Sequence, residues 1–214
     1  MNIAVEDSLS ECVLRRMLRH HRRDLTVKAR YPLKMLAGGV ANVRNVKEKR
    51  GLSGYGQLRV NLPAFNKAAE TGCPFVVLTD FDVHVRCPGQ LLAFWLSGVC
   101  PSSNLLFRVA VKEVEAWLLA DVTNMADFLA VDAAKIPLPI ETIPDPKVEI
   151  VELARGSRSP EIVADLVPRA GSTAEVGRYF ERSLMGFVRD VWDIDKAAHN
   201  SPSLLRALRA IDQL

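Results

Sequence analysis

The sequence predicts an α/β fold, with a mostly parallel sheet of about four strands flanked by helices. Two observations carry this prediction. Strand-like apolar segments alternate with amphipathic helical segments along residues 2–119, an order typical of layered α/β proteins. The segment 74–79 is a continuous apolar run that ends at Asp80, which fits a central parallel strand buried on both faces.

The elements of this core follow from local patterns. Ser8 or Ser10 is expected to cap the first helix, with Glu11 in its first turn. Pro63 is expected to interrupt or restart a later helix. Strands are expected at 2–6, 24–31, 74–79 and 105–111, helices at 8–18, 57–70, 88–96 and 113–119, and a glycine-rich basic loop at 38–56.

The remainder of the chain is predicted to be helical. A proline-rich connection follows Asp121, and helices are then expected at 146–155, 160–167, 173–190 and 202–212. We therefore expect an α/β core over 1–125 and a helical extension of the same domain over 126–214, packed on the sheet and without a core of its own.

Composition excludes several classes of protein. Hydrophobic residues make up 49% and charged residues 25% of the 214 positions, which are globular values. No apolar run approaches the roughly 18 residues of a membrane span, and an acid as early as Glu6 argues against a signal peptide. The four cysteines are scattered without zinc-ligand spacing. They are expected to be small buried side chains in a reducing compartment, which favours a cytoplasmic location.

Charge is distributed unevenly along the chain. Residues 1–70 hold 14 Lys and Arg against 6 Asp and Glu, whereas residues 71–214 hold 14 against 19. A basic first third favours a polyanionic partner such as nucleic acid, although solvated helix faces and a solvated loop would give the same counts. The candidate phosphate contacts are Arg44, Lys47, Lys49, Arg50 and Arg59.

Carboxylates follow three of the predicted strands. Glu6 ends the first strand, Asp80 and Asp82 follow the buried strand, and Glu113 and Glu115 follow the strand at 105–111. Functional crevices of open α/β sheets lie at the carboxyl ends of the strands. Converging carboxylates repel one another unless a cation bridges them, so Mg²⁺ or Mn²⁺ is the natural complement. Spacing does not decide between Glu113 and Glu115, of which one is expected to be an exposed helix residue.

At these residues the chain resembles the TOPRIM fold shared by topoisomerases, primases and nucleases of the overcoming-lysogenisation-defect class. The segments 5–11 and 76–82 are similar to the strand-end glutamate and paired-aspartate motifs of that fold, with Asp7 where a glycine is usual. The segments 109–121, 143–147 and 200–205 resemble a small bacterial branch of TOPRIM-like proteins known as a domain of unknown function.

The resemblance implies a metal-dependent nuclease-like activity. Glu6 would be the general acid/base or a metal ligand, Asp80 and Asp82 would hold Mg²⁺, and Glu115, with or without Glu113, would complete the acidic cluster. The function expected is phosphodiester cleavage in nucleic acid, in a defence or mobile-element system. The alternative is a non-catalytic or conditional module that works with a partner ATPase.

A third class also uses a D-x-D motif after an apolar strand. Phosphohydrolases of the haloacid-dehalogenase type carry it on the first strand of the core, with Thr or Val two residues after the second aspartate. Here the motif follows the third predicted strand and His84 occupies that position, so this class is disfavoured.

Overall fold

The computed structural model describes residues 1–21, 26–29, 54–72, 74–81 and 88–214. They form two compact units. The sheet unit comprises Met1–Val109 with Arg209–Leu214, and the helical unit comprises Ala110–Leu208. Each unit is described by itself below.

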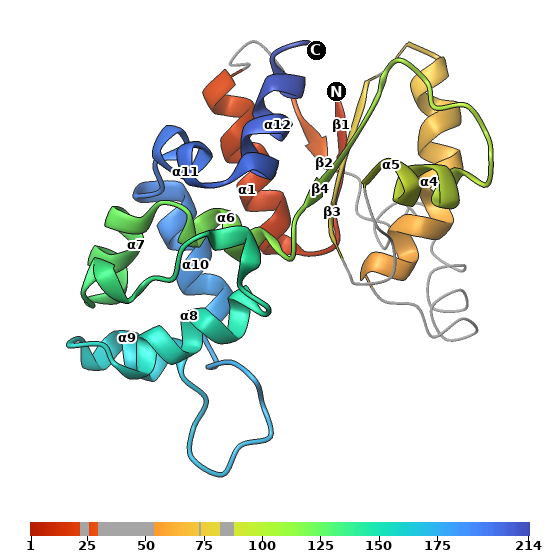
Figure 1. The fold of residues 1–214 in the computed structure, drawn as a ribbon. Coiled ribbons are helices and arrows are strands. Elements are labelled where there is room, and N and C mark those ends of the chain that lie inside the picture. Colours follow the sequence, from red (N-terminus) through yellow and green to blue (C-terminus); the bar gives the residue numbers. More distant parts are fainter. Residues whose placement is uncertain (22–25, 30–53, 73, 82–87) are drawn as a thin grey trace. The chain divides into compact units, whose positions relative to one another are not determined.

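The sheet unit is built on one sheet with strand order β2-β1-β3-β4 (Figure 1). Strand β1 runs parallel to β2 and to β3, with Ala4 opposite Val77. The amide of Phe75 donates to the carbonyl of Asn104 at 2.9 Å, which joins the starts of β3 and β4. The predicted α/β class with a parallel sheet is therefore confirmed. The elements are β1 (Asn2–Ala4), α1 (Ser8–His21), β2 (Lys28–Ala29), α4 (Gly54–Glu70), β3 (Phe75–Asp80), α5 (Pro88–Leu96) and β4 (Leu105–Ala110).

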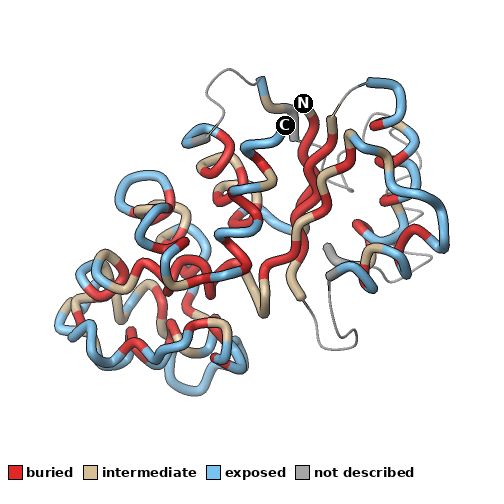
Figure 2. Tube along the Cα trace, turned by 45° about the horizontal axis from the view of Figure 1, so that its top comes forward, coloured by how far each residue is buried: buried red, intermediate tan, exposed pale blue. Residues whose placement is uncertain are grey.

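Helices cover both faces of this sheet, α1 on one and α4 with α5 on the other (Figure 1). The apolar side chains of α1 that face the sheet are fully or almost fully buried, Val13 and Met17 among them. On the opposite face, Val77 packs in one cluster with Leu62 and Trp95. Strand β3 is thus buried on both sides (Figure 2), which explains why its sequence is apolar without alternation.

Three local expectations for this unit need correction. Asp7, not a serine, caps α1, because its Oδ1 accepts the amide of Ser10 at 2.7 Å. Helix α4 runs without a break through Pro63, whose exposed position leaves the carbonyl it frees within reach of solvent. Cys100 is exposed and Cys12 is half-buried, so neither is the buried side chain expected.

The helical unit begins at the end of β4. Its helices are α6 (Val114–Leu119), α7 (Val122–Leu129), α8 (Pro146–Arg155), α9 (Pro160–Leu166), α10 (Phe180–Asp190), α11 (Ile194–Asn200) and α12 (Pro202–Ile211), with 3-10 turns η1 (Ala133–Lys135) and η2 (Ile140–Thr142). The helix expected at 173–190 starts only at Phe180, because residues before it form a loop that returns to α9.

Large aromatic side chains are buried within the helical unit. Trp117, Trp192 and Phe187 are buried almost completely, and the indole nitrogen of Trp192 donates to the carbonyl of Trp117 at 3.3 Å. The second compact unit begins at Ala110, and within it α6 packs against α8, α11 and η2. The domain boundary expected at residue 125 stays a prediction. Among the described helices, none is long and apolar enough to cross a membrane.

Candidate functional site

The carboxyl edge of the sheet brings Glu6 to the end of β3. The register pairs Ala4 with Val77, and continuing it by two residues places Glu6 beside Thr79. The hydroxyl of Thr79 donates a short hydrogen bond to Glu6 Oε1. The amide of Asp80 donates to the same oxygen at 3.1 Å. One carboxylate oxygen is therefore fixed by two donors from the neighbouring strand.

Asp80 follows directly along this edge. Side chains alternate between the two faces of a strand, and Phe81 packs against the α4–α5 cluster on the same face as Phe75 and Val77. Alternation therefore places the Asp80 side chain on the face opposite to Phe81. Ala4 belongs to the same cluster as Val77, so the same rule places Glu6 on the Phe81 face, and the backbone amide of Asp80 makes the contact between the two residues. Asp82 lies outside the described residues, so its proposed partnership with Asp80 stays a prediction.

The chemistry of this edge suits a hard cation. Glu6 and Asp80 are both half-buried, so solvent reaches them at a place where two strands end. Carboxylate oxygens are the ligands that Mg²⁺ prefers. Within the part of the chain that the structure describes, no group of three or more His, Cys, Asp or Glu side chains is assembled for a metal ion.

Thr79 is the residue of this edge that sequence reasoning missed. It is buried, and its hydroxyl directs Glu6. The available signal was a hydroxyl side chain at the end of an otherwise apolar strand, immediately before the aspartates. A β-branched threonine favours the extended backbone there, and its oxygen provides the donor that a valine would lack.

Glu113 and Glu115 lie in the helical unit, where both are within ion-pair distance of one lysine. The ammonium nitrogen of Lys147 is 3.7 Å from Glu113 Oε1 and 3.6 Å from Glu115 Oε1. The amide of Lys147 also donates to Glu113 Oε2 at 3.3 Å. Neither glutamate is an exposed helix residue, since their side chains are 28% and 6% exposed. The expectation that one would be exposed is therefore wrong.

Burial raises the pKa of Glu113. Desolvation raises the pKa of Glu113 above its ordinary value, while the charge of Lys147 works in the opposite direction and that of Asp145 reinforces the rise. The two glutamates at the start of α6 thus face Lys147 at the start of α8. The two glutamates and Lys147 are named together below as the lysine cluster.

The most distinctive sequence motifs hold the helical unit together. The indole nitrogen of Trp117 donates to Ser203 Oγ at 2.8 Å. The side-chain amide of Asn200 donates to the carbonyl of Ala120 at 2.9 Å. Asp121 is fully buried, and its Oδ2 accepts the amide of Asp193 at 2.7 Å. The strings at 109–121 and 200–205 thus meet in space and serve packing and hydrogen bonding.

The expected phosphate contacts are described only in part. Arg44, Lys47, Lys49 and Arg50 lie outside the described residues. Arg59 is exposed on α4, and its guanidinium carbon lies 4.3 Å from the ring centroid of Phe94 on α5. Phe94 is itself 55% exposed, so this cation–π pair presents charge and an aromatic ring to solvent.

Comparison of the chain with protein-family models, with curated proteins and with solved structures finds no match.

Proposed function

We propose that the sheet unit is a TOPRIM-like domain of four parallel strands that cleaves phosphodiester bonds in nucleic acid with Mg²⁺ or Mn²⁺. One observation supports this above all: Glu6 and Asp80, from two adjacent strands, meet at the carboxyl edge of the sheet through the amide of Asp80. A bound metal ion would supply an activated water and neutralise charge on the phosphoryl group. Asp80 and Asp82 would hold it.

The chain's own contribution is orientation. Glu6 Oε1 is fixed by the Thr79 hydroxyl and the Asp80 amide, so the carboxyl group meets an incoming phosphate in a set position. A group held in this way can accept or deliver a proton at the scissile phosphate without first reorganising. Arg59 and the basic residues at 44–50 would contact phosphates that flank the scissile phosphate.

The test is a cleavage assay with purified full-length protein. Single-stranded and double-stranded DNA and RNA of defined sequence are incubated with Mg²⁺ or Mn²⁺ at about millimolar concentration, or with EDTA. Cleavage of at least one substrate is expected only with metal, and Asp80→Asn should reduce its rate by roughly 100-fold or more. The matched control is Asp127→Asn, an exposed acid of the helical unit, which should cleave at the wild-type rate.

Metal binding gives a second measurement. Mg²⁺ or Mn²⁺ should raise the thermal midpoint of the wild-type protein, because a ligand that binds only the folded state stabilises it. The Asp80→Asn, Asp82→Asn double variant should lose that response. If calorimetry detects no metal binding at millimolar concentration and no substrate is cut, the cleavage proposal is wrong, and the ATPase-dependent module becomes the better account.

A further inference from the structure

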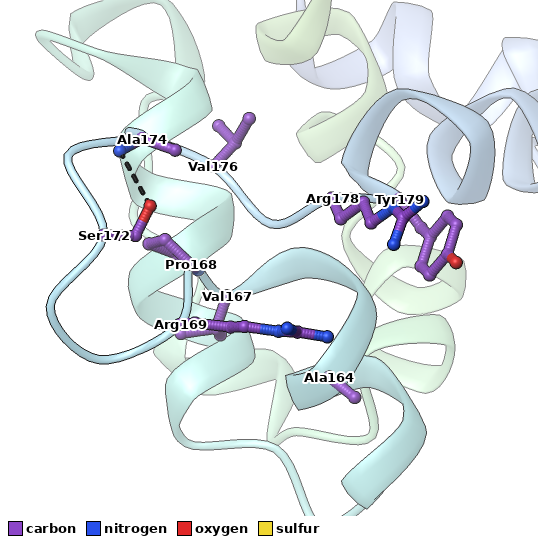
Figure 3. Close-up of a pocket in the computed structure, with 9 residues that line it drawn as sticks. All are labelled: Ala164, Val167, Pro168, Arg169, Ser172, Ala174, Val176, Arg178 and Tyr179. Atoms are coloured by element: carbon purple, nitrogen blue, oxygen red, sulfur yellow. Dashed lines mark hydrogen bonds between the residues drawn. The ribbon is translucent and has the colours of Figure 1, made fainter.

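The helical unit contains a cavity of about 280 Å³ that none of the sequence motifs touches. It lies between the end of α9 and the loop 167–179 that leads to α10 (Figure 3). Two arginines, Arg169 and Arg178, line it together with Ser172 and Tyr179. Its volume is at the lower end for a small-molecule site, which suits a ligand of nucleotide size or less.

The cavity carries positive charge without internal neutralisation. Among the described residues, neither Arg169 nor Arg178 forms an ion pair. Glu175 belongs to the same loop but does not line the cavity. Asp165, at the end of α9, already accepts the hydroxyl of Ser183 at 3.1 Å. Two guanidinium groups beside one small cavity favour an anion, and phosphate suits their paired N–H donors.

The loop that presents these arginines is fixed at both of its arms. On the returning arm, the amides of Gly177 and Tyr179 donate to the carbonyls of Leu166 and Asp165 at 2.8 and 3.1 Å. Arg178 stands between these two anchored residues. Gly177 is required there, because a Cβ would lie 2.3 Å from the carbonyl oxygen of Asp165.

The outgoing arm is a tight turn. The amide of Ser172 donates to the carbonyl of Arg169 at 3.0 Å, and Gly171 supplies the positive φ of 79° that the third position of a type II turn needs. Ser172 Oγ accepts the amide of Ala174 at 3.0 Å, which leaves the hydroxyl proton available to donate. Figure 3 shows the Arg169 side chain extended from this arm alongside α9.

The other walls are apolar and aromatic. Val167, Pro168 and Val176 line the cavity, and the guanidinium carbon of Arg178 lies 5.4 Å from the ring centroid of Tyr179. A ligand with both a phosphate and a flat, weakly polar part would satisfy both kinds of wall. Base stacking on tyrosine and on arginine is a common mode of nucleotide recognition.

We propose that this cavity binds a nucleoside monophosphate, with its phosphate on Arg169 and Arg178 and its base against Tyr179. The site belongs to the helical unit alone, so it does not depend on the cleavage proposed for the sheet unit. Ser172 would donate its hydroxyl proton to a phosphate oxygen.

The test is isothermal titration calorimetry of the full-length protein with four probes separately: the 5′-monophosphates of adenosine and uridine, adenosine, and inorganic phosphate. At least one monophosphate should bind with a dissociation constant below about 1 mM, and more tightly than adenosine or inorganic phosphate. Arg169→Gln and Arg178→Gln should each weaken it about tenfold. Tyr179→Ala should weaken the monophosphate but leave the affinity for inorganic phosphate unchanged.

Arg189→Gln is the matched control, since Arg189 is exposed on α10 and does not line the cavity. Its affinity should equal that of the wild type. Thermal midpoints of all variants should stay within about 2 °C of the wild type, because the altered side chains are exposed. The proposal is wrong if neither monophosphate binds, or if Arg189→Gln weakens monophosphate binding as much as Arg169→Gln and Arg178→Gln do. Either result would count regardless of the outcome of the cleavage assay.

Discussion

Carboxylates gather in both units of this protein, but their neighbours differ. At the carboxyl edge of the sheet, Glu6 Oε1 accepts hydrogen bonds from a hydroxyl and a backbone amide, which fix its position. In the lysine cluster, an ammonium group lies within 3.7 Å of both glutamates. A carboxylate held by neutral donors keeps its charge for a cation, whereas one paired with lysine has its complement already. On this comparison, the cleavage proposed above would take place at the sheet edge, and the lysine cluster would contribute to structure.

The largest effect expected from this comparison concerns activity. Glu6→Gln removes the charge but keeps a carbonyl oxygen that can accept the Thr79 and Asp80 hydrogen bonds. Metal-dependent cleavage should fall by about 100-fold or more, while Glu113→Gln should change it by less than about threefold. Single-turnover rates at a temperature well below every thermal midpoint would measure both. A larger loss from Glu113→Gln than from Glu6→Gln would reverse the assignment.

A large stability effect is expected inside the helical unit. Asp121→Ala removes the acceptor for the Asp193 amide and for the side chain of Asn124, at 2.7 and 2.8 Å. It should lower the free energy of unfolding by about 3 kcal/mol, since a buried hydrogen-bond acceptor is removed and its two donors are left unpaired. Urea denaturation followed by tryptophan fluorescence would report it, because Trp117 and Trp192 both belong to this unit.

The control for that measurement is Asp127→Ala on the exposed side of α7, expected to change stability by less than about 0.5 kcal/mol. If the Asp121 and Asp127 variants lost equal stability, the buried hydrogen bonds of Asp121 would not be what holds α7 to α11.

A smaller effect should follow from breaking the lysine cluster. Lys147→Met leaves Glu115 buried without its cation and should cost about 1–2 kcal/mol, less than a fully buried pair because Lys147 is 38% exposed. Adding Glu115→Gln should recover part of this loss. A double-mutant cycle on the free energy of unfolding would measure the coupling. Additive effects of the two changes would show that the Lys147–Glu115 pair contributes nothing to the free energy of unfolding.

The fold class could be predicted because it depends on the spacing of apolar residues, which is read directly from the sequence. The unbroken apolar run of β3 indicated burial on both faces, and α1 and α4 cover them in the structure. The α6 segment was harder. Its Glu-Ala-Trp-Leu-Leu-Ala-Asp string follows a strand and therefore suggested the catalytic core, but its burial partners are α8, α11 and η2, which lie far along the chain.

The candidate site, too, could be predicted only in part from the sequence. Strand-end position was enough to bring the Glu6 carboxylate to the backbone amide of Asp80, because adjacent parallel strands end at one edge. The same rule failed to reveal the role of Glu113 and Glu115, since it contains no information on Lys147, more than thirty residues later. Long-range ion pairs leave no periodic trace in a sequence, and neither does the hydrogen bond by which Thr79 directs Glu6.

The smallest effect expected is a pH dependence at Glu113. Its pKa is raised in the folded protein, chiefly by burial, so folding favours the protonated form. The stability that protonation provides is full below the ordinary glutamate pKa and is lost as pH rises through the raised value. Glu113→Gln removes this titration and keeps an oxygen for the Lys147 amide. Relative to the wild type, the variant should therefore become more stable as pH rises from 4 toward neutrality (roughly the window in which the group ionises).

The facing charges support that sign. The charge of Asp145 reinforces the raised pKa of Glu113, and the charge of Lys147 opposes it as a smaller cause than desolvation, so neither reverses the trend. Thermal midpoints measured in EDTA at several pH values would give the difference between variant and wild type. Glu152→Gln is the control, because Glu152 is exposed beside Arg155, and its difference should stay flat. If the Glu113→Gln difference instead fell with rising pH, attraction to Lys147 would outweigh desolvation, and the lysine cluster would be a net source of stability at neutral pH.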